Sequence, residues 1–539
     1  MNKIFFFIFY STFLFAQDIS FQIERSQLFE DDYKDSEIVL AEKSDKDEFI
    51  IVRSYKSGVS VKRGFYIEKY NKSLNRKSAF DFEIEHSNNE KYSLFLGSFF
   101  YDAKVYIFEI FYDLKSKNYI CRANIIDEKY RVSKQELFQL SKDEVKGFGL
   151  QNLYYDLNYL DLNKNNLGLF ELEEKSSYSF LYGNVSSKVS NDNSRSNVVF
   201  KVNNKKTLFS IAMTFQFRNE DFTKLFLFDS NLNKKIEKDF LFEKDKVINK
   251  NIELHDSLNI IYLTQKVFLD ELKKKETGGK YIYEIKKITP EEVKTKKIEV
   301  ENHYLTSLTS FCFESTLYGI GFYSDKDDFK YSGISFFELD SQNLEIKNSK
   351  YNPFTEQFII DKYGKLKNKE FKNIVINGLY RNEKNDICIN AEEVYKTSGE
   401  GGTFNNYDDI VSINLNSKGE LLTAKNINKT QSVSYKENSS FLSYSSSVLN
   451  NKNYFFINAK DQIKELSTGR IEFKGANTIS NSSLYIISRD NEGDFGYKEV
   501  LNNEQTEVPF MVSKGITIDN SIIFLGRKGK KKQLLKITL

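Results

Sequence analysis

Residue types that often carry enzyme chemistry are scarce in this chain. Its 539 residues include three cysteines, three prolines, three histidines and no tryptophan. The histidines, His86, His255 and His303, lie far apart, and neither an HExxH nor a CxxC motif occurs. These absences exclude the familiar spacings of zinc ligands. The sequence also lacks a GxSxG nucleophile elbow and a GxxxxGK[ST] phosphate loop, so we expect neither a metal nor another cofactor.

An excess of charge of one sign is also missing. The chain has 78 basic and 76 acidic residues, a formal net charge of +2. Such a balance creates no overall field that would attract nucleic acid or an anionic membrane, so we expect neither as a partner. No stretch after the N-terminus approaches the length of about 18 apolar residues that a spanning helix needs, which predicts no membrane span.

The three cysteines, Cys121, Cys312 and Cys388, each stand in an apolar context. An exported protein that is stabilised by disulfides usually has many more cysteines, in pairs. We therefore expect buried core thiols. One disulfide with one remaining free thiol is the alternative.

The N-terminus has the pattern of a secretory signal peptide. Lys3 provides a positive start, an uncharged apolar run extends from Ile4 to Ala16, and polar residues follow from Gln17. The run is too short for a membrane span, and Ala16 is a small residue suited to cleavage. We predict a signal peptide over 1–16 and export to the periplasm or cell surface.

The mature chain repeats one pattern of strands and tight turns. In residues 48–84, EFIIVRSY is followed by GFYIEKY, the turn NKSLN and the strand SAFDFEI. Related units occupy 92–125, 207–243, 259–300, 315–349 and 373–428, with a shorter one at 508–539. The turns are rich in Asn, Asp, Gly and Ser, which favour hairpins, and the 48 Phe and 33 Tyr favour strands.

Units of this length bury their apolar faces only against their neighbours. We therefore predict an all-β protein, a β-propeller of about seven blades (six to eight) made of antiparallel four-stranded meanders. Residues 17–539 would form this single domain. The last unit is one strand short, and ISFQIER at 19–25 could pair there and close the ring. An array of two-sheet sandwiches is the alternative architecture.

The second half of the chain resembles a known group of proteins. The motifs NIVINGLY, DICINAEEVY, GEGGTFNNYDD and YFFINAKD follow one another between residues 373 and 461. In this order they resemble exported, propeller-like proteins of uncharacterised function from Bacteroidota, as does FLFAQ at the end of the signal peptide. Members of the group tend to have Trp and Ile-Pro-Lys where this chain has Thr423, Asn428 and Lys429. The resemblance implies a fold and a compartment but no activity.

One cluster of polar residues surrounds the glycine-bearing loop at 398–406. Loops on a rigid scaffold concentrate binding residues, and paired carboxylates with separated pKa values can act as acid and base. A solvated strand end is the plainer interpretation. The candidate binding residues are Glu392, Glu393, Tyr395, Tyr407, Asp408 and Asp409.

One modification site is suggested by a short sequence. Asp256-Ser257-Leu258 resembles the Asp-Ser/Thr-apolar sequence at which Bacteroidota O-glycosylate exported proteins, which makes Ser257 the candidate acceptor.

These features favour a non-catalytic scaffold of the cell envelope that binds a protein or a glycan. One alternative is a glycan- or ester-active hydrolase with carboxylates at the propeller centre, and another is a structural subunit of a surface assembly. An enzyme would gather several Asp, Glu, His or Tyr from different repeats at the pore, whereas a scaffold would present aromatic surface.

Overall fold

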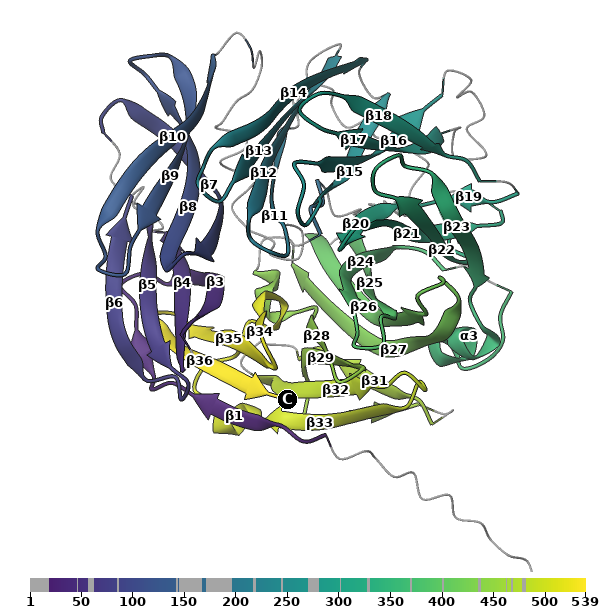
Figure 1. Ribbon diagram of the computed structural model, residues 1–539. Coiled ribbons are helices and arrows are strands. Elements are labelled where there is room, and N and C mark those ends of the chain that lie inside the picture. The colour runs from purple at the N-terminus through teal and green to yellow at the C-terminus, as the bar shows by residue number, and fades with distance from the viewer. Residues whose placement is uncertain are drawn as a thin grey trace, which may run out of the picture.

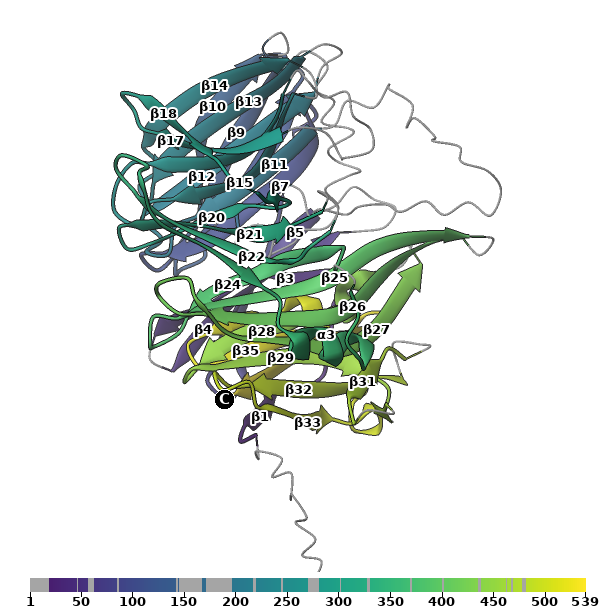
Figure 2. The same cartoon turned by 90° about the vertical axis from the view of Figure 1, so that its right-hand side faces the viewer.

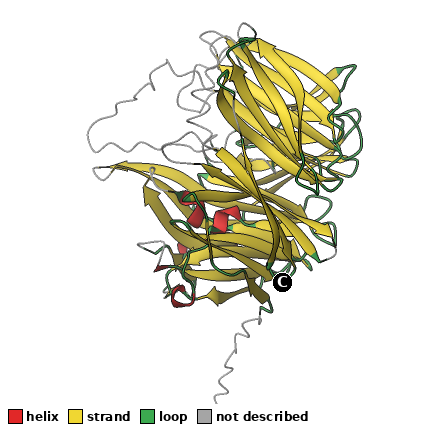
Figure 3. Cartoon of the chain, turned by 90° about the vertical axis from the view of Figure 1, so that its left-hand side faces the viewer, coloured by secondary structure: helices red, strands yellow, loops and turns green. Residues whose placement is uncertain are grey.

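The fold is a ring of β-sheets. The computed structural model describes residues 19–45, 47–56, 63–84, 87–141, 144, 167–170, 196–216, 220–243, 246–269, 281–300, 302–326, 330–368, 371–399, 402–434, 438–461, 463–466, 469–476 and 481–539. Within them, antiparallel strands form eight sheets around a central axis (Figure 1). In the described residues, helix is confined to one short α-helix and a few 3-10 turns (Figure 3). The predicted signal peptide, 1–16, lies outside the described residues.

The first four sheets, called blades 1 to 4, are meanders of four strands that follow the chain, with the first strand of each nearest the axis. Their strands are β3 (Asp35–Asp45), β4 (Glu48–Lys56), β5 (Arg63–Asn71), β6 (Arg76–Glu83), β7 (Glu90–Tyr101), β8 (Lys104–Asp113), β9 (Asn118–Ile126), β10 (Val132–Ser141), β11 (Ser196–Val202), β12 (Leu208–Gln216), β13 (Glu220–Asp229), β14 (Lys234–Glu243), β15 (Val247–Leu254), β16 (Ile261–Phe268), β17 (Tyr281–Ile288) and β18 (Val293–Ile298).

Blades 5 to 8 carry additions to the same plan. Their strands are β19 (Tyr304–Leu305), β20 (Thr309–Phe313), β21 (Thr316–Ser324), β22 (Gly333–Asp340), β23 (Ile346–Pro353); β24 (Ile374–Arg381), β25 (Ile387–Gly399), β26 (Gly402–Leu415), β27 (Leu421–Ser434), with β30 (Lys464–Glu465) and β31 (Ile471–Lys474); β28 (Ser445–Leu449), β29 (Lys452–Ala459), β32 (Ser483–Arg489), β33 (Phe495–Leu501); and β34 (Ile516–Ile518), β35 (Ser521–Lys528), β36 (Lys531–Thr538), β1 (Gln22–Arg25) and β2 (Phe29–Glu30).

The helical elements are few. The α-helix α3 (Glu356–Tyr363) begins at the N-cap Thr355 and ends at Gly364, whose φ of 72° suits a glycine C-cap. The 3-10 turns are η2 (Ser439–Phe441), η4 (Asn503–Gln505) and η5 (Val512–Lys514). Among the described residues, no helix has the length and apolar character needed to cross a membrane.

The hydrophobic core lies between blades rather than within one. Cys121 and Phe138 of blade 2 pack with Phe226 of blade 3, and equivalent clusters join every neighbouring pair of blades, including blades 8 and 1. The middle strands are accordingly buried on both faces, as in β32, whereas outer strands such as β18 are mostly exposed. This packing and topology establish the predicted all-β propeller.

The blade count of eight lies at the upper end of the predicted range and one above the number of units recognised in the sequence. Blade 7 was missed because residues 460–482 separate its second strand, β29, from its third, β32. Part of this insertion, β31, pairs in parallel with β27 and covers the outer edge of blade 6.

The predicted closure of the ring by the N-terminal segment is confirmed. β1 pairs antiparallel with β36, in a register that runs from Gln22 opposite Thr538 to Arg25 opposite Leu535. The last sheet therefore combines strands from both ends of the described chain, and the two ends meet at one blade (Figure 1).

A buried ion network secures the segment that leads from β2 into blade 1. Arg53 of β4 donates from Nη1 to Asp31 Oδ2 at 2.5 Å and from Nε to Glu68 Oε2 at 2.9 Å. The side chains are 1%, 4% and 1% exposed, respectively. The guanidinium also lies 4.8 Å from the centre of the Tyr66 ring. Close pairing offsets the cost of removing these charges from water.

A short piece of the chain also fills part of the centre of the ring. Residues 167–170 belong to the connection between blades 2 and 3, yet they lie against β15 of blade 4. Leu169 pairs with Asn251, and the side chains of Leu167, Leu169 and Phe170 are buried. We call this segment the central plug.

We expect Arg53→Met to lower the free energy of unfolding by about 3–5 kcal/mol, because it leaves the buried Asp31 without its ion-pair partner and the buried Glu68 with the half-exposed Arg76 alone. Urea denaturation measures the loss. Arg131→Met is the matched control, since Arg131 is 76% exposed beside Asp127, and it should change the midpoint little. Equal effects of the two substitutions would contradict the assigned role of the buried network.

Lys532 provides a second test of the closing blade. Its ammonium is buried and donates to the carbonyl oxygens of Lys34 at 3.0 Å and Gly529 at 2.6 Å. Burial lowers the pKa of Lys532 to about 8, although Asp31 partly offsets the effect. In the unfolded chain this lysine has an ordinary pKa of about 10.4. Between pH 8 and that value, the unfolded chain therefore binds more protons than the folded chain.

We therefore expect the stability of the wild type, relative to Lys532→Met, to rise between pH 8 and about 10.4 and to stay level below pH 8. Denaturant midpoints measured for both proteins across this range give the difference. A difference that stays flat throughout would show that Lys532 keeps its proton in the folded protein.

Candidate functional site

The six residues predicted from the sequence lie where three long strands of blade 6 leave the ring. β25, β26 and β27 have 13, 14 and 14 residues, and the β25–β26 hairpin extends past the other strands on one face (Figure 2). The register shifts between Glu392 and Val394 and between Tyr407 and Ile410. Such bulges redirect side chains, which places the acidic residues of both strands close together.

Lys362 of α3 joins two of these carboxylates. Its Nζ lies 2.5 Å from Glu393 Oε2 and 2.9 Å from Asp409 Oδ2. Asn426 Nδ2 also donates to Asp409 Oδ2, at 2.8 Å. Burial alone would lower the pKa of Lys362, but Asp409 and Glu393 outweigh it and raise that pKa. Burial raises the pKa of Glu393, and Lys362, which also serves Asp409, offsets only part of the rise.

Lys429 of β27 pairs with the third carboxylate. Its Nζ lies 2.7 Å from Glu392 Oε1, and these side chains are 0% and 2% exposed. The same ammonium donates to the carbonyl oxygen of Tyr407 at 2.6 Å, and Ser443 Oγ donates to Glu392 Oε2 at 2.5 Å. Burial raises the pKa of Glu392 despite the lysine.

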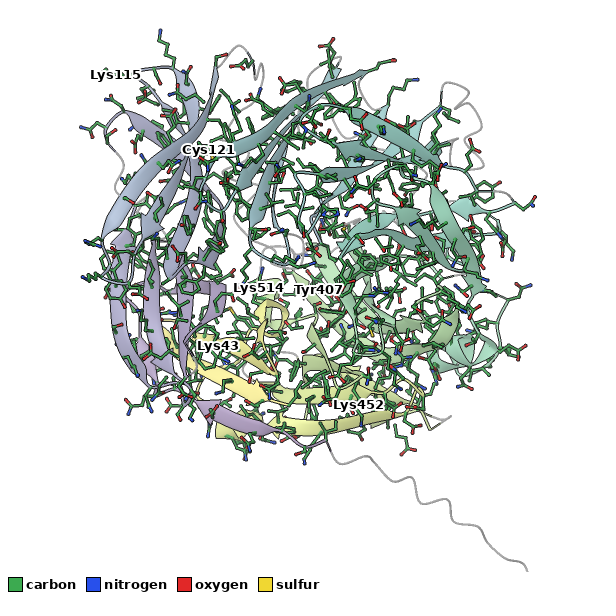
Figure 4. All side chains as sticks on the ribbon, in the orientation of Figure 1. Lys43, Lys115, Cys121, Tyr407, Lys452 and Lys514 are labelled. Carbon is green, nitrogen blue, oxygen red and sulfur yellow. The ribbon has the colours of Figure 1, made fainter. Side chains whose placement is uncertain are left out.

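The remaining pair spans the base of the hairpin. Tyr395 OH donates to Asp408 Oδ2 at 2.7 Å, and burial raises the pKa of both groups. Tyr407 lies toward the middle of the ring in the view along its axis (Figure 4). The structure thus brings the six predicted residues together, but each of the four carboxylates is already engaged by Lys362, Lys429 or Tyr395. This network fastens the hairpin to α3 and β27.

A different site, which the sequence did not indicate, lies at the centre of the ring. A cavity of about 500 Å³ is lined by the inner strands of six blades and by the central plug at Leu167. This volume is within the range of pockets that hold small ligands. The lining segments are 39–42, 97–99, 200–204 with 206, 377–380, 445–446 and 515–517.

The cavity wall is mainly uncharged and mixes polar with apolar residues. Its hydroxyl- and amide-bearing residues include Ser98, Asn377 and Thr517, and its apolar residues include Leu40 and Ile516. Two described lysines and one described carboxylate line it, and they have partners. Lys206 Nζ lies 2.6 Å from Glu42 Oε1, and Lys201 Nζ lies 3.2 Å from Glu253 Oε2.

Bulges interrupt four of the inner strands. Register shifts fall at Val39 in β3, Leu96 in β7, Lys250 in β15 and Asn377 in β24. A bulged residue is left out of the ladder, and the strand bends there. Val39, Asn377 and Gly97, which follows Leu96, line the cavity. In the sequence, the one sign of these bulges is the small and polar character of pairs such as Gly97-Ser98 and Asn377-Gly378.

Comparison with known proteins does not assign this chain to a family. No family model matches the chain, and no curated protein matches it. Among solved structures, the propeller domain of the trilobed protease from Pyrococcus furiosus has 10% identity and a TM-score of 0.33, over 88% of this chain and 98% of that one. The polysaccharide lyase Uly1 has 9% identity and a TM-score of 0.37, over 93% and 89%.

Prolyl oligopeptidase B from Galerina marginata has 9% identity and a TM-score of 0.32 over 84% of this chain. This chain spans about half of the length of that enzyme, 46%. Similarities at these TM-scores bear on neither activity nor ligand, and the fold assignment rests on the sheet topology and the packing between blades.

The other residues noted in the sequence lie apart from both sites. Cys121, Cys312 and Cys388 are buried and form no disulfide, as the core-thiol interpretation predicts. Ser257 lies in an exposed turn between β15 and β16, where its hydroxyl accepts a hydrogen bond from Lys205 Nζ at 3.0 Å. His86 lies outside the described residues, and the described part of the chain contains no cluster of metal-binding side chains.

The raised pKa of Glu393 predicts that the stability of the folded protein depends on pH. The folded chain binds the proton of this carboxyl more tightly than the unfolded chain, whose glutamate pKa is about 4.3. The resulting stabilisation is present below that value and is lost as the pH rises through the folded pKa. We expect the wild type to lose stability relative to Glu393→Gln as the pH increases from about 4.3 toward neutrality. Parallel urea titrations measure this, and a wild type that gains stability instead would mean that Lys362 dominates.

Proposed function

We propose that this protein is a non-catalytic binding protein that holds one segment of a protein or glycan ligand in the central cavity. The observation that carries the proposal is the composition of the cavity wall. Six blades converge on it, and its lining combines residues with hydroxyl or amide groups with apolar residues such as Leu40 and Ile516. Convergent polar groups fix the orientation of a ligand, and apolar atoms beside them supply contact area.

The competing function, a hydrolase with carboxylates at the propeller centre, requires two carboxyl groups that face each other across the substrate. Glu42 is the one carboxylate among the described residues that line the cavity, and it is engaged by Lys206. The predicted acidic cluster of blade 6 contributes no residue to this wall. These observations favour binding over hydrolysis, and they favour an uncharged ligand segment because the charges at the wall are already paired.

We also propose a compartment in which the protein acts. The signal peptide predicted over 1–16 and the resemblance to exported Bacteroidota proteins support a role in the periplasm or at the cell surface. The ligand would then be a component of the envelope. A structural subunit of a surface assembly is the neighbouring possibility, and it differs in requiring a permanent protein partner instead of an exchangeable ligand.

A single bulky substitution tests whether the cavity binds a ligand. Thr517 lines the cavity and is exposed, so Thr517→Trp should fill the space without disturbing the core. The probes are neutral tetra- to hexasaccharides and phage-displayed octapeptides. A ligand that binds only the folded protein stabilises it by about 2.7 kcal/mol at a hundredfold excess over Kd. We expect such a thermal shift for the wild type and none for Thr517→Trp.

Thr295→Trp is the matched control, because Thr295 is exposed on the outer strand β18, and it should bind as the wild type does. Two results would refute the cavity as the binding site. One is equal binding by wild type and Thr517→Trp, and the other is the failure of both probe classes to shift the wild type.

A further inference from the structure

The central plug shows how this ring engages an extended chain. The backbone N–H of Phe170 donates to the carbonyl oxygen of Lys250 at 3.0 Å, and the N–H of Ile252 donates to that of Gly168 at 2.8 Å. Leu169 and Asn251 form the antiparallel bridge between these two hydrogen bonds. The plug therefore adds one antiparallel bridge to the inner edge of β15.

The plug binds at a bulge. The carbonyl oxygen of Lys250 accepts from Phe170, and the register between β15 and β16 shifts at this residue, between Asn249 and Asn251. Gly168 has φ of 62°, and a Cβ there would lie 2.0 Å from the carbonyl oxygen of Ile252, so this close approach requires glycine. A bulge on an inner strand thus offers main-chain groups to a chain in the channel.

The side chains of the plug enter the spaces between blades. Phe170 joins the cluster between blades 3 and 4, while Leu167 and Leu169 join the cluster between blades 5 and 6. Main-chain hydrogen bonds to a sheet edge, with alternate side chains in pockets, are the features of peptide recognition by strand addition.

The same kind of edge lines the open cavity. The bulged residues Val39 of β3 and Asn377 of β24 face it, as does Gly97 beside the bulge of β7. Ser98 Oγ, 3.3 Å from the carbonyl oxygen of Val39, shows that this bulged carbonyl accepts a donor from the neighbouring blade. The apolar residues Leu40, Phe200 and Ile516 also line the cavity.

We propose that the central cavity binds an extended, uncharged peptide segment by strand addition to the bulged inner edges of β3 and β24, in the way that β15 holds the central plug. This inference rests on the proposed function and specifies its ligand as polypeptide. An oligosaccharide could use the hydroxyl and amide groups of the wall, but it lacks the regularly spaced N–H and C=O groups that a sheet edge recognises.

The test begins with a selection from random phage-displayed octapeptides on the wild-type protein, with counter-selection on Thr517→Trp. The enriched peptides are synthesised, and each is remade with single N-methylated backbone amides. N-methylation removes one donor and leaves the side chains unchanged, so it separates strand addition from recognition of side chains alone. Neutral tetra- to hexasaccharides are titrated in parallel against the same proteins.

We expect peptides that bind the wild type and Thr295→Trp but not Thr517→Trp. Methylation of alternate amides should weaken binding about tenfold or more, because one edge of a strand pairs with the protein. Equal binding by every N-methylated form would overturn strand addition. Peptides that bind Thr517→Trp as well as the wild type would also overturn the inference, since they would bind elsewhere.

The saccharide titration separates this inference from the function on which it rests. Saccharide binding that Thr517→Trp abolishes, without any enriched peptide, would overturn the peptide assignment and support a binding cavity. Failure of both probe classes on the wild type would overturn both proposals. Melting temperatures of Thr517→Trp and Thr295→Trp, compared with the wild type, establish that each variant is folded.

Discussion

The middle strands of each blade bury both faces, so each sheet needs a neighbour on either side. β8 and β32 are buried along nearly their whole length, and apolar clusters fill every space between adjacent blades. A row of such sheets would leave two apolar faces in water, whereas a ring leaves none. Closure of the ring by β1 and β36 is therefore a requirement of the packing, and the buried Arg53 network stabilises the same junction.

Closing a ring of sheets has a second result, which concerns the inner edges. Each first strand presents one row of main-chain groups toward the axis, where no further strand of its own blade can pair with them. In blade 4 the central plug occupies part of this edge, and in blades 1 and 6 the edge borders the open cavity. The fold thus creates a lined, polar channel as a consequence of satisfying its apolar faces.

The sequence predicts the architecture better than it predicts the site. Strand runs such as VYIFEIFY and turns such as NKSLN indicate hairpins directly, and ISFQIER was correctly assigned to the closing blade. The acidic residues of blade 6 were rightly grouped, because they are neighbours in two paired strands. Their partner Lys362 lies on a helix, 31 residues before Glu393 and 47 before Asp409, and pairing over such distances leaves no local pattern. Bulges leave little pattern: the small, polar pair Asn377-Gly378 marks one of them, whereas Val39 differs from a regular strand residue only in register.

The register of the closing pair also determines how the ring responds to force. Gln22 lies opposite Thr538, so the two ends of the chain leave the β1–β36 ladder on the same side. Tension applied between them acts across the strands at one end of the ladder, so the hydrogen bonds break one after another. It does not load all of them at once in shear. A protein that is attached by one end only would carry no load on the β1–β36 pairing. A protein that is stretched between two attachment points would begin to open at blade 8.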